Sequence, residues 1–167
     1  APNGLQVEGT REVKHIVLGV SASLGLIDEA ARRGADVVLV HHGWFWKGES
    51  PRIAGVKGCR IRHLMQSGMH LVGYHLPLDA HETVGNNAEL ARVLGLTIES
   101  RHGEYGLLHV GEIISGAMLA ADFAQRVNAA LGRAPLLVGD AQKIVRRIGW
   151  CSGAAQDELA AAAALGC

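Results

Sequence analysis

The sequence predicts an α/β protein whose first part contains a mainly parallel sheet. The apolar run Val37–Val40 has the length and composition of a buried strand, and Val13–Val20 and Met69–Tyr74, both rich in apolar residues, are also expected to be strands. Between them, apolar residues recur at helical spacing in residues 24–31 and 61–65. A strand–helix–strand order of this kind requires right-handed crossovers, and these place successive strands in parallel.

Local signals mark where the predicted helices begin and end. Ser21-Ala22-Ser23 precedes the first helix and supplies an N-cap, and Gly34 ends that helix. After the third strand, Asn86 or Asn87 is expected to cap a helix that Gly95 closes.

The pattern changes near residues 100–106, where we place a domain boundary. The prediction is two α/β lobes, residues 1–102 and residues 103–167, with the second incomplete at its C-terminus. The second lobe is expected to contain strands at 107–114, 136–138 and 144–150, and helices at 119–131 and 154–165.

Composition narrows the class of protein. Of the 167 residues, 49% are hydrophobic. Because 16 basic residues balance 16 acidic ones, the formal net charge is zero, which argues against nucleic acid as a partner. The longest apolar run, Leu159–Leu165, is too short to span a membrane. Three widely spaced cysteines favour reduced thiols and a cytoplasmic location. The chain starts without methionine and stops directly after a helical pattern, as expected of a fragment cut at both ends.

The most informative motif is His41-His42-Gly43, which follows the second predicted strand. A second cluster, residues 74–81, follows the third strand and contains His75 and Asp79. Ligands and metals commonly bind at the carboxyl ends of parallel strands, so nitrogen and carboxylate donors leaving two such strands predict a metal site.

Other interpretations of these residues remain open. Adjacent histidines on a strand point to opposite sides, so His41 and His42 would serve two metals, or one metal and one hydrogen bond, or would be structural. Pro77 favours a loop between His75 and Asp79, and that loop could simply cap the next helix. Taken together, the clusters favour a pair of divalent ions about 3.5–4 Å apart that activate a hydroxide, with zinc, manganese, iron or nickel as candidates.

Two further segments could contribute to binding. Trp44, Phe45 and Trp46 cannot all be core residues, so one could stack on a ring, and Lys47 could meet a phosphate; burial or a subunit contact explains the aromatics equally well. Cys151-Ser152-Gly153 is a turn whose backbone amides could hold an anion, and Cys151 has no neighbouring histidine that would make it a nucleophile.

With these motifs laid out, the chain resembles the YbgI-type, or Nif-three-like, family of GTP cyclohydrolase I type 2 homologues. The matching stretches are residues 1–9, 34–36, 41–48, 74–81 and 85–87, and the resemblance runs over essentially all 167 residues. It implies a Nif-three-like fold, two divalent metal ions per subunit in the cleft between two lobes, and a ring-shaped homo-hexamer built as a trimer of dimers.

The resemblance also implies roles for individual residues. His41, His42 and Asp79 would be metal ligands, and His75 would be a ligand or lie next to one and act as a proton carrier. The family completes its site with a histidine and a glutamate four residues later, near its C-terminus, and also has an opening helix; this chain contains neither segment.

The leading hypothesis is therefore a metal-dependent hydrolase acting on a nucleotide-like or heterocyclic molecule. A non-catalytic metal-binding scaffold or regulatory protein is the alternative. A ring associated with nucleic acid is a third hypothesis, which the neutral charge disfavours.

Overall fold

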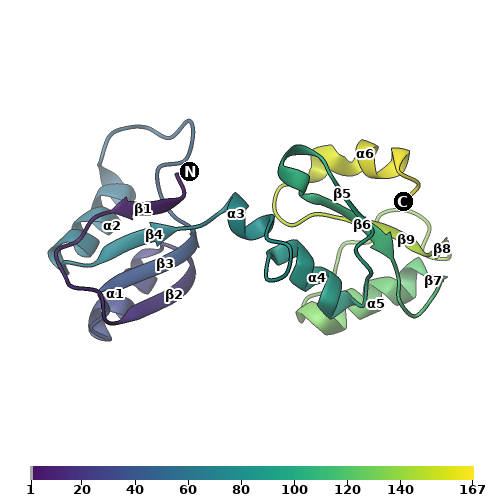
Figure 1. Cartoon of the computed structure of the whole chain (residues 1–167), viewed down its shortest axis with the longest axis horizontal. Coiled ribbons are helices and arrows are strands. Elements are labelled where there is room, and N and C mark those ends of the chain that lie inside the picture. Colours follow the sequence, from purple (N-terminus) through teal and green to yellow (C-terminus); the bar gives the residue numbers. More distant parts are fainter. Residues whose placement is uncertain (1) are drawn as a thin grey trace. The chain divides into compact units, whose positions relative to one another are not determined.

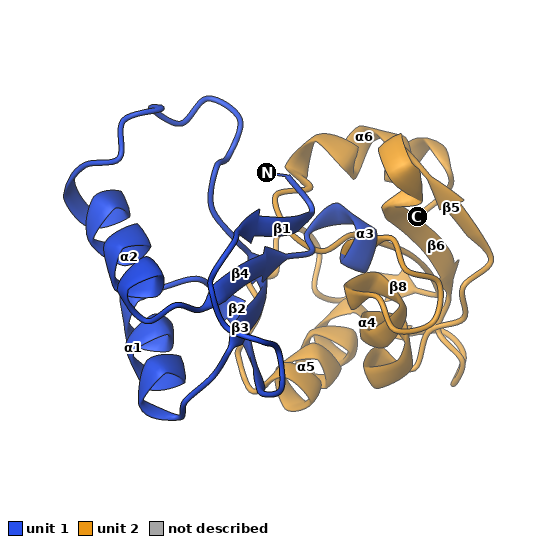
Figure 2. Ribbon diagram, turned by 60° about the vertical axis from the view of Figure 1, so that its left-hand side comes forward, with its two compact units in different colours: residues 1–78 blue, residues 79–167 orange. Residues whose placement is uncertain are grey.

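The computed structural model describes residues 2–167 and contains two compact units that divide between Leu78 and Asp79 (Figures 1 and 2). Ala1, the first residue of the first predicted lobe and of one matching stretch, lies outside the described residues. Each unit has its own hydrophobic core.

Unit 1 is a four-stranded sheet with two helices. Its elements are β1 (Gly4–Val7), β2 (Ile16–Ser21), α1 (Leu24–Arg32), β3 (Val37–His42), α2 (Gly55–Gln66) and β4 (His70–Gly73). The strand order is β1-β4-β3-β2; β2, β3 and β4 are parallel and β1 is antiparallel to β4. This confirms the predicted mainly parallel sheet. Of the three predicted strands, β2 begins three residues later than expected, β3 continues through His41 and His42, and β4 is shorter.

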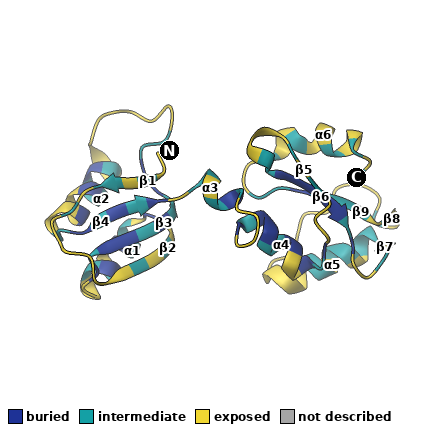
Figure 3. Cartoon of the chain, in the orientation of Figure 1, coloured by how far each residue is buried: buried dark blue, intermediate teal, exposed yellow. Residues whose placement is uncertain are grey.

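The core of unit 1 lies between the helices and one face of the sheet (Figure 2). Val38 and Val40 of β3 belong to this core together with Ile27 of α1 and Leu64 of α2, and all four are buried. Figure 3 colours much of β3 as buried. The N-cap of α1 is as expected, because the Ser23 hydroxyl accepts a hydrogen bond from the backbone N–H of Leu26 at 3.2 Å.

Apolar side chains on the other face of β2 remain in contact with solvent. Ile16, Leu18 and Val20 alternate along the strand and are 52%, 70% and 69% exposed. A row of exposed apolar residues on an edge strand is typical of a surface that another element or chain covers.

A single-turn helix, α3 (Leu76–Asp79), follows β4 and carries the division between the units. The sequence predicted a loop here because of Pro77. That prediction was wrong: Pro77 lies in the first turn, where a missing backbone N–H costs nothing.

Unit 2 is a small antiparallel sheet with helices. Its elements are α4 (Asn86–Leu94), β5 (Ser100–His102), η1 (Glu104–Gly106), β6 (Leu108–Glu112), β7 (Met118–Leu119), α5 (Ala120–Leu131), β8 (Ile144–Val145), β9 (Arg147–Trp150), η2 (Gln156–Glu158) and α6 (Leu159–Ala164). Strands β5, β6 and β9 form one antiparallel sheet in that order, and β7 pairs with β8.

Helix α4 belongs to this second unit, although the sequence analysis placed residues 1–102 together. Its buried residues Ala91 and Leu94 pack in one cluster with Ile113 and Trp150, which explains why the compact unit begins before the predicted boundary.

Three local predictions for unit 2 differ from the structure. Residues 136–138 form no strand, and Leu136 and Val138 are 89% and 83% exposed. The helix expected over residues 154–165 is reduced to η2 and α6. The N-cap of α4 is Gly85, and neither Asn86 nor Asn87 caps the helix, because both side chains bind elsewhere in the unit.

His109 of β6 is expected to make the stability of unit 2 depend on pH. It is 1% exposed, its ring lies 5.6 Å from that of Trp150, and burial lowers its pKa below the usual 6.5. Because the unfolded chain then binds a proton before the folded one does, His109 favours folding above pH 6.5 and this contribution is lost as the pH falls below that value.

Urea unfolding at pH 7.5 and pH 5.5 measures this effect. The free energy of unfolding should fall between the two pH values, and His109→Gln should show a smaller fall than the unchanged chain. An equal fall in both proteins would show that other groups cause it.

Candidate metal centre

Three histidines converge at the carboxyl edge of the sheet in unit 1. His41 and His42 are the last residues of β3, and His75 follows β4, its parallel neighbour. One ring nitrogen from each of the three lies within 4.8 Å of the others. The structure thus brings His75 to the same edge as His41 and His42, as their positions after parallel strands predicted.

The rings of the consecutive histidines do not point apart, contrary to what strand alternation predicted. The ring centroids of His41 and His42 are 4.5 Å apart, and that of His75 lies 4.8 Å from His41 and 5.5 Å from His42. Both residues lie beyond the last β3–β4 pair, Val40 with Gly73, so no cross-strand side chain of β4 separates their rings. One ion could therefore contact all three imidazoles.

Hydrogen bonds hold two of these rings. Nδ1 of His41 lies 3.0 Å from the carbonyl oxygen of Tyr74, and because a carbonyl only accepts, this nitrogen carries the proton and Nε2 keeps its lone pair. Nδ1 of His42 lies 3.0 Å from the Ser21 hydroxyl, which suits the same tautomer. An imidazole whose second nitrogen is held by an oxygen is the usual arrangement of a metal-binding histidine.

The aromatic residues after the histidines have three different environments. Trp44 is buried, and its Nε1 donates to the carbonyl of Ala22 at 2.9 Å. Phe45 packs at the edge of the core. Trp46 meets the His75 ring edge-on at 4.8 Å and donates from Nε1 to the Gly43 carbonyl at 3.1 Å, so Trp46 is the one that lies beside the three histidines.

Gln6 of β1 links the segment that leaves β3 to the N-terminal residues. Its Oε1 accepts from the backbone N–H of Trp44 at 2.7 Å, and its Nε2 donates to the Pro2 carbonyl at 2.7 Å. The amide occupies the space beside Gly43 and Gly73: a Cβ at Gly43 would collide with Gln6, and one at Gly73 would lie 2.8 Å from its Nε2. A larger residue at either position would therefore displace the Gln6 amide from its hydrogen bonds.

Asp79 lies in unit 2 and is buried, with 7% exposure. Its Oδ1 accepts a hydrogen bond from Nδ2 of Asn86 at 2.7 Å and one from the Ser152 hydroxyl at 3.2 Å. The metal role of Asp79 stays a prediction.

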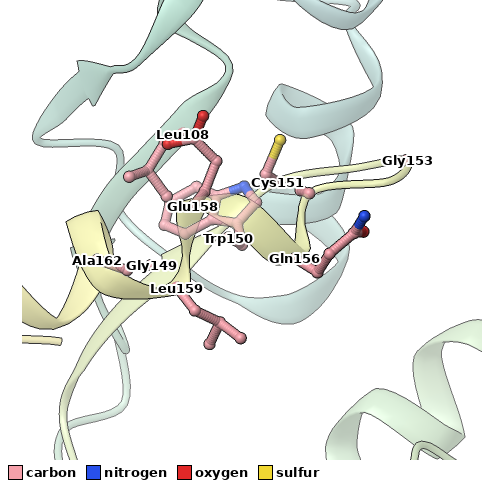
Figure 4. Close-up of a pocket in the computed structure, with 10 residues that line it drawn as sticks. Leu108, Gly149, Trp150, Cys151, Gly153, Gln156, Glu158, Leu159 and Ala162 are labelled. Carbon is pink, nitrogen blue, oxygen red and sulfur yellow. The ribbon is translucent and has the colours of Figure 1, made fainter.

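A hollow of about 280 Å³ lies next to β9 in unit 2 (Figure 4). Trp150, Cys151 and Glu158 line it, together with Leu108, Gly149 and other residues. Burial, and then the charges of Glu158 and Asp79, raise the pKa of the Cys151 thiol, so it stays protonated and is a poor nucleophile. The backbone N–H of Ser152 donates to Asn87 at 2.6 Å, which removes a donor from the predicted anion site.

Sequence reasoning missed Ser21, Gln6 and the carbonyl of Tyr74. A carbonyl has no sequence signal, and a lone serine or glutamine has no distinctive pattern. Gly43, directly after the two histidines, was the only indication in the sequence that another side chain lies close to the backbone there.

Comparisons with known proteins agree with this fold. The family model described as Duf34/NIF3 (NGG1p interacting factor 3) matches residues 1–167. A Pseudomonas aeruginosa protein named "GTP cyclohydrolase 1 type 2 homolog" is 50% identical over 99% of this chain and 66% of its own length, and an Escherichia coli protein of the same name is 48% identical with the same coverage.

Solved structures with a similar sequence and fold are also found. One described as "protein ybgI, unknown function" is 48% identical with a TM-score of 0.93, over 99% of this chain and 66% of that one. The protein TTHA1606 from Thermus thermophilus is 35% identical with a TM-score of 0.81, over 96% and 64%.

Fold and histidine cluster define an α/β protein with a candidate metal centre. More particularly, the chain belongs to the Duf34/NIF3 family. It spans 66% of the length of the curated relatives that it matches. No helix among residues 2–167 has the length and apolar character needed to cross a bilayer.

Proposed function

We propose that this protein is a divalent-metal-dependent hydrolase acting on a nucleotide or a related heterocycle. His41, His42 and Asp79 would hold two metal ions per subunit, and His75 would be a further ligand or a proton carrier. The observation that carries the proposal is the meeting of three imidazole nitrogens within 4.8 Å at the carboxyl edge of a parallel sheet.

The donor set fits a divalent transition metal. Three imidazoles suit zinc, manganese, iron or nickel, and the hydrogen bond between Nδ1 of His41 and the Tyr74 carbonyl is the second contact usual for a metal-binding histidine. Bound cations would supply the Lewis acidity that activates water for attack. The protein would orient the imidazoles through Tyr74 and Ser21, and His75 would hold or pass a proton.

A flat side chain beside the histidines supports a heterocyclic substrate. Trp46 lies against His75 and offers an aromatic surface for stacking, and Lys47 next to it is exposed and could meet a phosphate. The name of the curated relatives, "GTP cyclohydrolase 1 type 2 homolog", refers to a nucleotide, which supports the same substrate class.

Metal content and turnover test the proposal together. The chain should hold metal after reconstitution and dialysis, measured by inductively coupled plasma mass spectrometry. It should hydrolyse at least one nucleotide in a panel that includes GTP, and chelation or Asp79→Ala should abolish that turnover. Stable metal binding without any hydrolysis would favour the non-catalytic scaffold.

We also propose that the protein assembles with itself into a ring-shaped hexamer, a trimer of dimers, in the cytoplasm. The exposed apolar row of Ile16, Leu18 and Val20 supports a covered surface, and the three free cysteines suit a reducing compartment.

Leu18→Lys is expected to reduce the size of this assembly, because a charge would enter an apolar contact. Light scattering after size-exclusion chromatography gives the mass, and Leu136→Lys, at another highly exposed leucine, is the control. Unchanged mass for Leu18→Lys would exclude the face of β2 as the contact surface.

A further inference from the structure

We propose that Asn86 and Ser152 are positioning residues that fix the Asp79 carboxylate for metal binding. This inference rests on the proposed function, because it requires Asp79 to be a ligand. All the contacts that carry it lie within unit 2.

Both side chains hold the same oxygen of Asp79. Nδ2 of Asn86 donates to Oδ1 at 2.7 Å, and the Ser152 hydroxyl donates to Oδ1 at 3.2 Å. The donors come from distant parts of the chain, one from the first turn of α4 and one from the loop after β9. Two donors from different directions fix the plane of the carboxylate and hence the direction of Oδ2.

One of the two donors, Ser152, is itself held by a buried side chain. Asn87 is 0% exposed; its Oδ1 accepts from the backbone N–H of Ser152 at 2.6 Å, and its Nδ2 donates to the Leu107 carbonyl at 3.1 Å. The carbonyl oxygen of Asn87 accepts from Nε1 of Trp150 at 2.9 Å. The position of Ser152 is therefore set by the core of unit 2.

This arrangement has a direct consequence for metal affinity. A carboxylate that is already oriented loses less freedom when it binds a cation, and hydrogen-bonded partners behind metal-binding carboxylates typically account for about 10- to 100-fold in metal affinity. Burial of Asp79 strengthens the effect, because water competes poorly for Oδ1.

The contacts could instead serve only to tie the loop after β9 to α4. In that case loss of either donor would lower stability and leave metal affinity unchanged. Metal affinity and thermal stability must therefore be measured on the same variants.

The experiment measures the dissociation constant for Zn²⁺ by competition with a chromophoric chelator, and the melting temperature without metal. The variants of the full chain are Ser152→Ala, Asn86→Ala, Asp79→Asn and each alanine variant combined with Asp79→Asn. Ser152→Thr keeps a hydroxyl and should rescue binding. Ser115→Ala removes another hydroxyl of unit 2, one that accepts from Arg126 at 2.9 Å, and is the matched control.

Ser152→Ala and Asn86→Ala should each weaken Zn²⁺ binding about 10-fold. When combined with Asp79→Asn, neither alanine variant should weaken Zn²⁺ binding further. Ser152→Thr and Ser115→Ala should bind Zn²⁺ as tightly as the unchanged chain. If Asp79→Asn weakens binding and the alanine variants do not, the positioning role is wrong. If Asp79→Asn itself has no effect, the proposed ligand set fails instead.

Discussion

His41→Ala is expected to lower the affinity for Zn²⁺ by more than 100-fold. The loss should exceed the roughly 10- to 100-fold that removal of an outer hydrogen-bond partner costs, because a direct donor disappears. His41 is also the imidazole whose tautomer the Tyr74 carbonyl fixes. Isothermal titration calorimetry with Zn²⁺ measures the change.

His63→Ala is the matched control for this prediction. His63 lies in α2 of the same unit and its ring contacts Asp28 at 3.0 Å, away from the three-histidine cluster. It should bind Zn²⁺ as tightly as the unchanged chain. Equal losses in the two variants would mean that zinc binds histidines of unit 1 without regard to the cluster.

Gly43→Ala is expected to destabilise unit 1 and weaken metal binding together. The added Cβ would collide with Gln6, whose amide accepts from Trp44 and donates to Pro2. Overpacking of this kind costs about 1–3 kcal/mol, and the collision lies directly after His42. Chemical denaturation and zinc titration of the same variant measure both effects.

Gly25→Ala separates this steric effect from the general effect of replacing glycine. Gly25 lies in α1, nothing is within 4 Å of an added Cβ, and alanine favours helices, so the unfolding free energy should rise by up to about 1 kcal/mol. If Gly43→Ala were as well tolerated as Gly25→Ala, the role of Gln6 as a fastening residue would be wrong.

The parallel part of unit 1 was predictable because its signals are local. Val37–Val40 is a continuous apolar run bounded by polar residues and glycine, and Ser23 precedes a helical pattern with a hydroxyl in the capping position. Strand β1 was not expected, since its Leu5 and Gln6 are explained only by pairing with a distant partner, β4. Short strands set by non-local pairing carry little pattern of their own.

In unit 2, tertiary contacts of side chains override a helix-capping signal in the sequence. Asn86 and Asn87 stand where capping residues are common, and helix boundaries alone gave no reason to expect otherwise. In the structure Asn86 binds Asp79 and Asn87 binds the loop after β9, so tertiary contacts use both amides. The strand predicted over residues 136–138 is not formed, because its apolar residues Leu136 and Val138 have no partner strand within the described residues.

Only the histidine donors of the candidate site could be predicted from the sequence. That His41, His42 and His75 leave neighbouring parallel strands follows from sequence order, and the topology rules then bring them to one edge. The orientation of two of the rings depends on Tyr74 and Ser21, and Gln6 holds the segment that follows His42 through the backbone N–H of Trp44. These are contacts between distant residues without a motif.

X-ray absorption spectroscopy at the zinc edge of the zinc-loaded protein tests the central claim most directly. Convergence of His41, His42 and His75 predicts nitrogen neighbours at about 2.0–2.1 Å with the outer-shell scattering of imidazole rings, and His41→Ala should weaken that scattering. A first shell of sulfur at about 2.3 Å, or a spectrum without imidazole scattering, would contradict the claim.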